Sequence, residues 1–170
     1  YQLSEIIEAV KIPRGSQTRA FFTSGGYMLN VKQLREYVIR PVLRELNAHS
    51  DAAELLLLGT AAQESRFEYI HQLGGGPALG LWQMEPATHN DIVNNYLQYR
   101  PELAAAIFRA SGCAGFAANN LLKNLSYACA MARVHYLRVR EALPADLDGQ
   151  AAYWKLHYNT PLGKGLVHEY

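Results

Sequence analysis

The sequence predicts a mainly α-helical domain with one buried central helix and little or no β-structure. Two observations indicate this fold class. Apolar residues recur every three or four positions in several segments, as on one face of a helix. The segment from Asp51 to Glu64 is instead apolar nearly all round, as expected for a helix enclosed by others. With 170 residues, 49% of them hydrophobic and 18% charged, the chain suits a single core.

The first helices are predicted between residues 31 and 64. Val31, Leu34, Val38, Val42 and Leu46 share one face by three- and four-residue steps, which predicts a helix over residues 31–49. Pro41 should kink or split this helix. Asp51, with Glu54 three residues later, resembles a capping pair at the start of the central helix.

Prolines delimit the helices of the second half. Pro86 and Pro101 suit first helical positions, and the helices that they begin should run through Leu97 and Phe108. A long helix is expected up to Pro144, followed by a last one in the stretch DGQAAYWKLHYN. The stretch LGGGP breaks regular structure, and ALGLWQM after it is short enough for a strand or an extended loop.

Residues 1–30 differ from the rest, because they combine a Pro-Arg-Gly turn and a Ser-Gly-Gly hinge with no sustained period. We expect a loosely organised arm here that docks to a partner, since Phe21 and Phe22 need a surface to cover them. The remainder, residues 31–170, is expected to form the domain itself.

Charge and hydropathy exclude several classes of protein. A net charge of +1 gives no field for phosphate backbones, so no nucleic-acid partner is expected. The longest apolar stretch, from Leu55, falls short of the ~20 residues that cross a bilayer, so no membrane span is expected. Cys113 and Cys129 are predicted to be free, buried thiols. Secretion stays open, because a chain that opens on Tyr1 is compatible with processing or with a fragment.

Metal and nucleophilic-serine sites are not predicted, and no cofactor is expected. The sequence lacks the HExxH spacing of zinc sites, the GxSxG elbow of serine hydrolases and the Gly-Lys-Ser/Thr of phosphate loops. The six histidines are therefore interpreted as surface or hydrogen-bonded residues: His49, His71, His89, His135, His157 and His168.

The stretch around Glu64 combines residue types that suit a carbohydrate site. At the end of an apolar helix, both the helix dipole and the apolar neighbours disfavour the carboxylate of Glu64, as in a glycosidase acid. Ser65 would orient this acid by a hydrogen bond, and the glycines 74–76 would let backbone approach a bulky ligand. Trp82 offers a face for a sugar ring and Gln83 a donor and an acceptor. Taken singly, these residues are more often a solvated helix end, a core aromatic and a loop amide.

As an ordered set, these motifs resemble the lysozyme-like soluble lytic transglycosylases, including versions built into bacteriophage particles. The matching stretches are ES at Glu64–Ser65, GLWQ at Gly80–Gln83, MEPAT at Met84–Thr88 and HYN at His157–Asn159. The sequence departs from the family pattern at Trp82, where Met is usual, at the inserted Glu85, and at Thr160–Pro161, where Ala-Gly is usual.

The resemblance implies a lysozyme-like fold and cleavage of the MurNAc-GlcNAc linkage of peptidoglycan, with Glu64 as the single acid and base. It implies that Tyr158 supports Glu64 and that Asn159 holds the substrate or the acid. The substrate-binding or supporting residues would be Ser65, Gly80, Trp82, Gln83, Met84, Tyr158 and Asn159. A hydrolase needs a second carboxylate, and the nearby candidates are Glu68, Glu85 and Asp91. Acids in such positions are more often solvated surface residues, so a lyase is favoured.

The resemblance also implies a location and partners. The protein would be carried in a phage virion, as a tail or internal protein bound to other virion proteins through residues 1–30, and would act on glycan strands in the bacterial periplasm. A bacterial cell-envelope enzyme is the alternative location. A virion protein that keeps the fold with weak or lost catalysis is the alternative function, and a glycan-binding module without turnover is a third.

Overall fold

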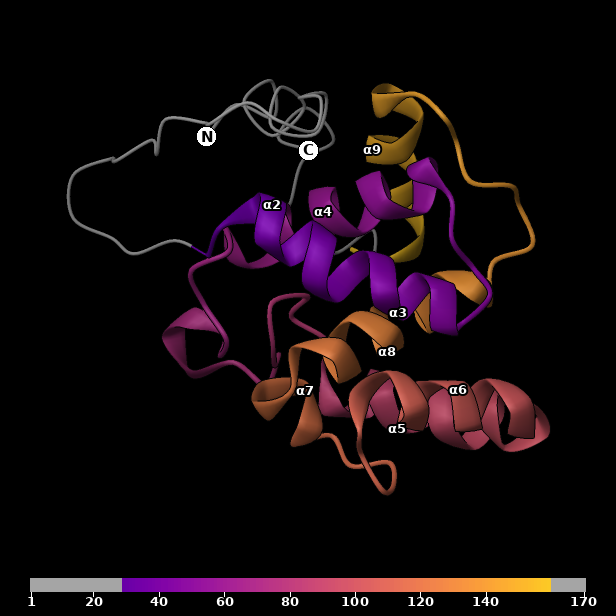
Figure 1. The fold of residues 1–170 in the computed structure, drawn as a ribbon. Helices are drawn as coiled ribbons and strands as arrows, with labels where there is room; N and C mark the ends of the chain where they lie inside the picture. Colours follow the sequence, from indigo (N-terminus) through magenta and orange to yellow (C-terminus); the bar gives the residue numbers. More distant parts are fainter. Residues whose placement is uncertain (1–28, 160–170) are drawn as a thin grey trace.

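The computed structural model describes residues 29–159, which are mainly α-helical, as predicted (Figure 1). The elements are α2 (Val31–Leu34), η1 (Arg35–Ile39), α3 (Arg40–Glu45), α4 (Asp51–Ser65), η2 (Leu73–Gly75), α5 (Pro86–Asn95), η3 (Leu97–Tyr99), α6 (Pro101–Ser111), α7 (Asn120–Lys123), α8 (Leu125–Leu137) and α9 (Leu147–His157). Within this range no strand forms, and β-pairing is limited to isolated antiparallel bridges among His71, Leu79 and Met84.

Some predictions fall outside the described residues. Nearly all of the expected arm at residues 1–30, including Phe21 and Phe22, lies there, and so do Thr160 and Pro161. Of the arm, Leu29 and Asn30 are described, and the Asn30 side chain caps α2 by accepting the N–H of Gln33 (3.0 Å).

Pro41 interrupts the α-helical hydrogen-bond pattern of the first predicted helix, although the helical path continues through it. It lies in the first turn of α3, where its missing N–H and its ring are incompatible with an uninterrupted α-helix. The five residues of η1 directly before it form a π-helical turn, which shifts the hydrogen-bond register and accommodates the ring. The chain from α2 to α3 therefore runs as one continuous rod in front of α4 (Figure 1).

The central helix is α4, which contacts α3, η1, α8 and α9. Its leucines Leu56, Leu57 and Leu58 are fully buried although they point in different directions around the helix, which confirms the predicted enclosure. The predicted cap is wrong by one residue, because the N-cap is Ser50, whose Oγ accepts the N–H of Ala53 (3.1 Å).

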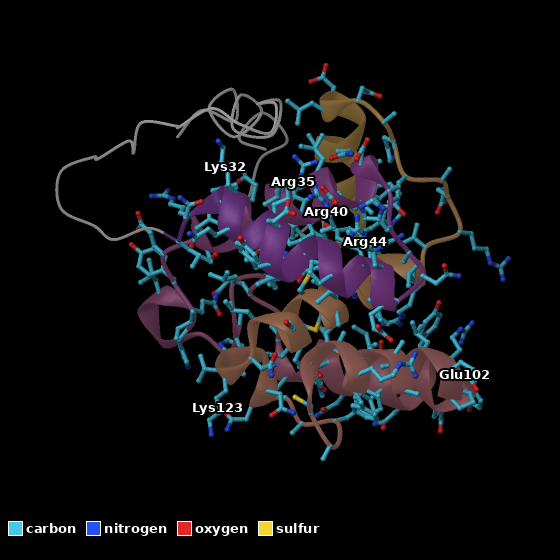
Figure 2. The ribbon with its side chains drawn as sticks, viewed as in Figure 1. Lys32, Arg35, Arg40, Arg44, Glu102 and Lys123 are labelled. Carbon is cyan, nitrogen blue, oxygen red and sulfur yellow. The ribbon has the colours of Figure 1, made fainter. Side chains whose placement is uncertain are left out.

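Glu54 does not complete a capping pair, because its carboxylate is bound by the side chains of two arginines and a histidine. Arg35 Nε lies 2.5 Å and Arg40 Nε 2.7 Å from its oxygens, and His49 Nε2 lies at 2.7 Å. Both arginines project from the α2–α3 rod (Figure 2). Burial alone would raise the pKa of Glu54, but these hydrogen bonds outweigh it and lower the pKa to about 2.

The helices that begin at Pro86 and Pro101 start as predicted; the second extends through Phe108 to Ser111, whereas two other ends come earlier than expected. Pro86 and Pro101 open α5 and α6. The first of these helices ends at Asn95, before the expected Leu97, and α8 ends well before Pro144. One reason is that the hydroxyl of Tyr96 donates to the carbonyl of Leu137 (3.0 Å) and so satisfies one of the last carbonyls of α8. Helix α8 is as buried as α4, and it contacts α3, α4, α5, α6 and α7.

Both cysteines are free thiols, as predicted, but only one of them is fully buried. Cys129 is fully buried, which raises its pKa, and Cys113 is half-buried. Among residues 29–159, no helix combines the length and the apolar character needed to cross a membrane.

We predict that Glu54→Gln lowers the free energy of unfolding by about 3–5 kcal/mol at pH 7, because it removes the buried carboxylate that pairs with two half-buried arginines. The depressed pKa of Glu54 means that its contribution is present above about pH 4.5 and is lost as the pH falls toward 2. Urea unfolding at a series of pH values measures both effects. Glu45→Gln is the matched control, since Glu45 pairs with Arg109 at the surface (2.6 Å) and should cost less than about 1 kcal/mol.

Candidate active site

Glu64 lies in the last turn of α4, where the helix dipole is negative and disfavours a carboxylate. Burial raises the pKa of Glu64 to about 7, although a hydrogen bond from Trp154 and the charge of Lys155 both act to lower it. The side chain is half-buried rather than sealed in the core. A carboxyl group with this pKa is partly protonated near neutral pH.

The direct partner of Glu64 is Trp154, which lies on α9. Its indole Nε1 donates to Oε1 of Glu64 at 3.0 Å, and its ring is 1% exposed. In the sequence Trp154 is most simply explained as a core residue, and that interpretation missed this contact. The available signal was its position four residues before Tyr158, which places both on neighbouring turns of one helix face.

Tyr158 is close to Glu64 but does not donate to it. Its hydroxyl donates to the carbonyl oxygen of Trp82 at 2.7 Å, so the contact expected with Glu64 is made by Trp154 instead. Burial, and then the charge that Glu64 carries when ionised, raise the pKa of Tyr158 well above its usual value. The ring packs edge-on against His135, with ring centroids 5.1 Å apart, which fixes its orientation.

Trp82 is a core residue, so the expected sugar-stacking face is not available. It is 1% exposed, and its indole Nε1 donates to the carbonyl of Leu57 on α4 at 2.9 Å. The physical reason is that the turn from Gly80 to Gln83 folds back against α4 and directs the indole inward. Through its own carbonyl, Trp82 instead anchors Tyr158.

The GLWQ stretch forms a tight turn that needs glycine at its first position. Gly80 has φ +74°, and a Cβ there would lie 2.3 Å from the carbonyl oxygen of Leu121. Gln83 also has a positive φ, 45°, and its side-chain amide donates to the carbonyl of Gly80 (2.8 Å). Leu79 and Met84 pair across the base of the turn, and Met84 is 3% exposed. Gly80, Leu81 and Trp82 are buried, so Gln83 is the residue of the GLWQ stretch that is half-buried.

Ser65 and Asn159 make different contacts from those expected. The hydroxyl of Ser65 donates to the carbonyl of Ala61 (3.0 Å), so it is engaged with its own helix and does not orient Glu64. The backbone N–H of Asn159 donates to the carbonyl of Trp154 (3.0 Å), which helps to end α9, and its side chain is half-buried.

Backbone strain flanks the acid. Arg66 and Phe67, directly after α4, have φ values of 54° and 58°, in a region that costs non-glycine residues on the order of 1–3 kcal/mol each. Residues 29–159 contain four non-glycine residues with positive φ. Two of them follow Glu64 closely, and a third, Gln83, lies in the GLWQ turn. In the expected glycine loop, Gly74 and Gly75 have φ values of +77° and +78° with open space beside them, whereas a Cβ on Gly76 would overlap the side chain of Gln72.

None of the three candidate second acids acts on Glu64. Of the groups in the described chain that shift its pKa, none is a carboxylate. Glu68 and Glu85 are exposed. Asp91 pairs with Arg138 at 2.7 Å, in a surface hollow of about 580 Å³ between the ends of α5, α8 and α9 that does not include Glu64. In residues 29–159 no group of three potential metal ligands is arranged to hold an ion.

We predict that Glu64→Gln makes the protein more stable at pH 8, by on the order of 2–3 kcal/mol, because the wild-type carboxyl must ionise in a buried position. A pKa raised from 4.5 to about 7 gives stability that is fully present below pH 4.5 and is lost as the pH rises to 7. The two proteins should therefore differ little at pH 4. Urea unfolding at both values tests this, and equal stability at pH 8 would contradict the raised pKa.

No protein-family model, curated protein or solved structure matches this chain, so its function has to be argued from the contacts of Glu64 themselves.

Proposed function

We propose that the chain is a peptidoglycan lytic transglycosylase with a lysozyme-like fold, in which Glu64 is the single acid and base. The observation that carries the proposal is the environment of Glu64: a half-buried carboxyl with a pKa of about 7 at the end of a buried helix. Support also comes from the proximity of Glu64 to Trp154 and Tyr158, and from the bond that ties Tyr158 to the GLWQ turn.

The chemistry proposed for Glu64 uses both of its protonation states. The protonated carboxyl donates its proton to the glycosidic oxygen, and the bond from that oxygen to C1 of MurNAc breaks. The resulting carboxylate then takes the proton of the MurNAc C6 hydroxyl, whose oxygen bonds to C1 to form the 1,6-anhydro product. A pKa near the working pH serves both steps, because neither state is strongly disfavoured.

A lyase outcome is favoured over hydrolysis because the nucleophile is internal to the substrate. Hydrolysis with two carboxylates requires a second one at roughly 5–10 Å from the acid. In the described chain, Asp91 is engaged by Arg138, and no carboxylate influences the ionisation of Glu64. A single acid and base therefore fits this environment better than a pair.

The neighbouring residues have distinct proposed roles. Gln83 presents its amide oxygen beside the turn, since its amide nitrogen is engaged by Gly80, and this oxygen would accept a sugar hydroxyl or acetamido N–H. Tyr158 maintains the distance between the GLWQ turn and α9, and Asn159 extends the same edge toward the glycan. Ser65, Trp82 and Met84 support the site from the core.

Delivery in a bacteriophage particle completes the proposal. The protein would be a tail or internal virion protein that acts in the bacterial periplasm, with residues 1–30 docking to other virion proteins and glycan strands as its substrate. The support for this location is the resemblance of its motifs to particle-associated members of the family, and a bacterial cell envelope is the alternative location.

We predict that the wild-type protein clears purified peptidoglycan and releases products that end in 1,6-anhydro-MurNAc, and that Glu64→Gln abolishes this, with a loss of at least about 10³-fold. Turbidity measures the clearing, and mass spectrometry identifies the ends. Glu68→Gln is the matched control, because this exposed acid four residues later should leave the rate unchanged.

Three results would overturn parts of the proposal. Reducing ends that carry added water would replace the lyase by a hydrolase. Full activity of Glu64→Gln would remove Glu64 from the chemistry. Retention of the wild-type protein on peptidoglycan without clearing would identify a binding module, and neither clearing nor retention would leave a structural virion protein.

A further inference from the structure

Trp154 occupies a position that links three parts of the site. Its indole N–H meets Oε1 of Glu64, and its own carbonyl accepts the backbone N–H groups of Tyr158 (2.8 Å) and Asn159 (3.0 Å). The ring is 1% exposed in the core between α4 and α9, so it has little freedom to turn. A change at this residue therefore reaches the acid and the end of α9 together.

The hydrogen bond from Trp154 engages only one of the two carboxyl oxygens of Glu64, Oε1. An indole nitrogen donates and cannot accept, so Oε1 must receive this hydrogen bond with a lone pair. In the protonated carboxyl, the oxygen without the proton is the better acceptor, which leaves the proton on Oε2. We propose that Trp154 is a positioning residue for Glu64, whose indole N–H holds Oε1 and so presents the acidic proton on Oε2 to the substrate.

This inference rests on the proposed function for its catalytic meaning, but the coupling between Trp154 and Glu64 is measurable without any substrate. The indole also favours the ionised carboxyl, and so does the ammonium group of Lys155, while burial opposes both. Within residues 29–159, Tyr158 is the other titratable group that faces Glu64. Loss of the indole N–H should therefore raise the pKa of Glu64 further.

The chain contains a matched control for this bond. Its two tryptophans, Trp82 and Trp154, are both 1% exposed, and both donate an indole N–H to an oxygen of α4. For Trp82 the acceptor is the backbone carbonyl of Leu57, which carries no titratable proton. Trp82→Phe and Trp154→Phe thus remove the same kind of buried hydrogen bond, and only the second touches the acid.

The first experiment is a pH titration of the tryptophan fluorescence of the full chain without substrate. Trp82→Phe, in which Trp154 is the only indole, should show a transition with a midpoint near pH 7. The transition should vanish in Trp82→Phe combined with Glu64→Gln, and it should be weak or absent in Trp154→Phe. A flat titration of Trp82→Phe, or one that persists without the carboxyl, would overturn the proposal.

The second experiment measures the pH dependence of kcat/KM for glycan cleavage. Trp154→Phe should move the alkaline limb to higher pH by about one unit and lower kcat, whereas Trp82→Phe should leave that limb in place. An unmoved limb in Trp154→Phe contradicts the positioning role. If the wild-type protein cleaves no glycan, the proposed function fails while the fluorescence titration still decides whether the indole senses the acid.

A shape-preserving variant separates the hydrogen bond from packing. Benzothienylalanine at position 154 replaces the indole N–H by sulfur in a ring of nearly the same size, and thermal melting shows whether the chain still folds. It should reproduce the shifted alkaline limb of Trp154→Phe. A wild-type pH profile with this side chain would show that only ring packing matters and would refute the positioning role.

Discussion

The burial of α4 is the constraint on which the rest of the structure depends. A helix that is apolar on all sides has to be enclosed, and α3, η1, α8 and α9 enclose it. Yet the helix carries Glu54 near its start and Glu64 near its end, about 15 Å apart at the rise of an α-helix. A buried carboxyl must either be paired with cations or keep its proton, and this helix contains one example of each solution.

The two solutions have opposite consequences. Two arginines and a histidine surround Glu54, so it stays ionised and fastens the α2–α3 rod to α4. Glu64 receives one neutral hydrogen bond and the field of one lysine, which are not enough to offset burial and the helix dipole. The fixed charge is structural, whereas the group poised between its two states is suited to proton transfer. The same physics that secures one end of the helix leaves the carboxyl at the other end able to gain or lose its proton near neutral pH.

The sequence predicted what depends on local pattern. Helical periodicity, the prolines at helix starts and the disturbed helix at Pro41 follow from backbone sterics and the burial of one face, and the structure has them. The apolar surroundings of Glu64 could be read in the same way. The ends of helices were less predictable, because the last carbonyl of α8, that of Leu137, is satisfied by a distant side chain, Tyr96, that no local rule identifies.

The contacts of the site could not be predicted from sequence either, because they cross between helices. Trp82 is expected to face a sugar and lies in the core, while Trp154 is in the core as predicted and also binds the acid. Both are indoles on segments far from α4 in sequence, and only the packing of those segments decides which one meets a carboxylate and which a backbone carbonyl. For the same reason, the hydroxyl of Tyr158, which is expected to support Glu64, instead donates to the backbone carbonyl of Trp82.

The central claim is that Glu64 keeps its proton near neutral pH while Glu54 does not. Selective ¹³C labelling of glutamate carboxyl groups, assigned with the two Glu→Gln variants, would follow each ionisation by NMR. The account predicts a midpoint near pH 7 for Glu64 and one near pH 2 for Glu54. A midpoint near 4.5 for Glu64, as for a solvated carboxyl, would contradict it.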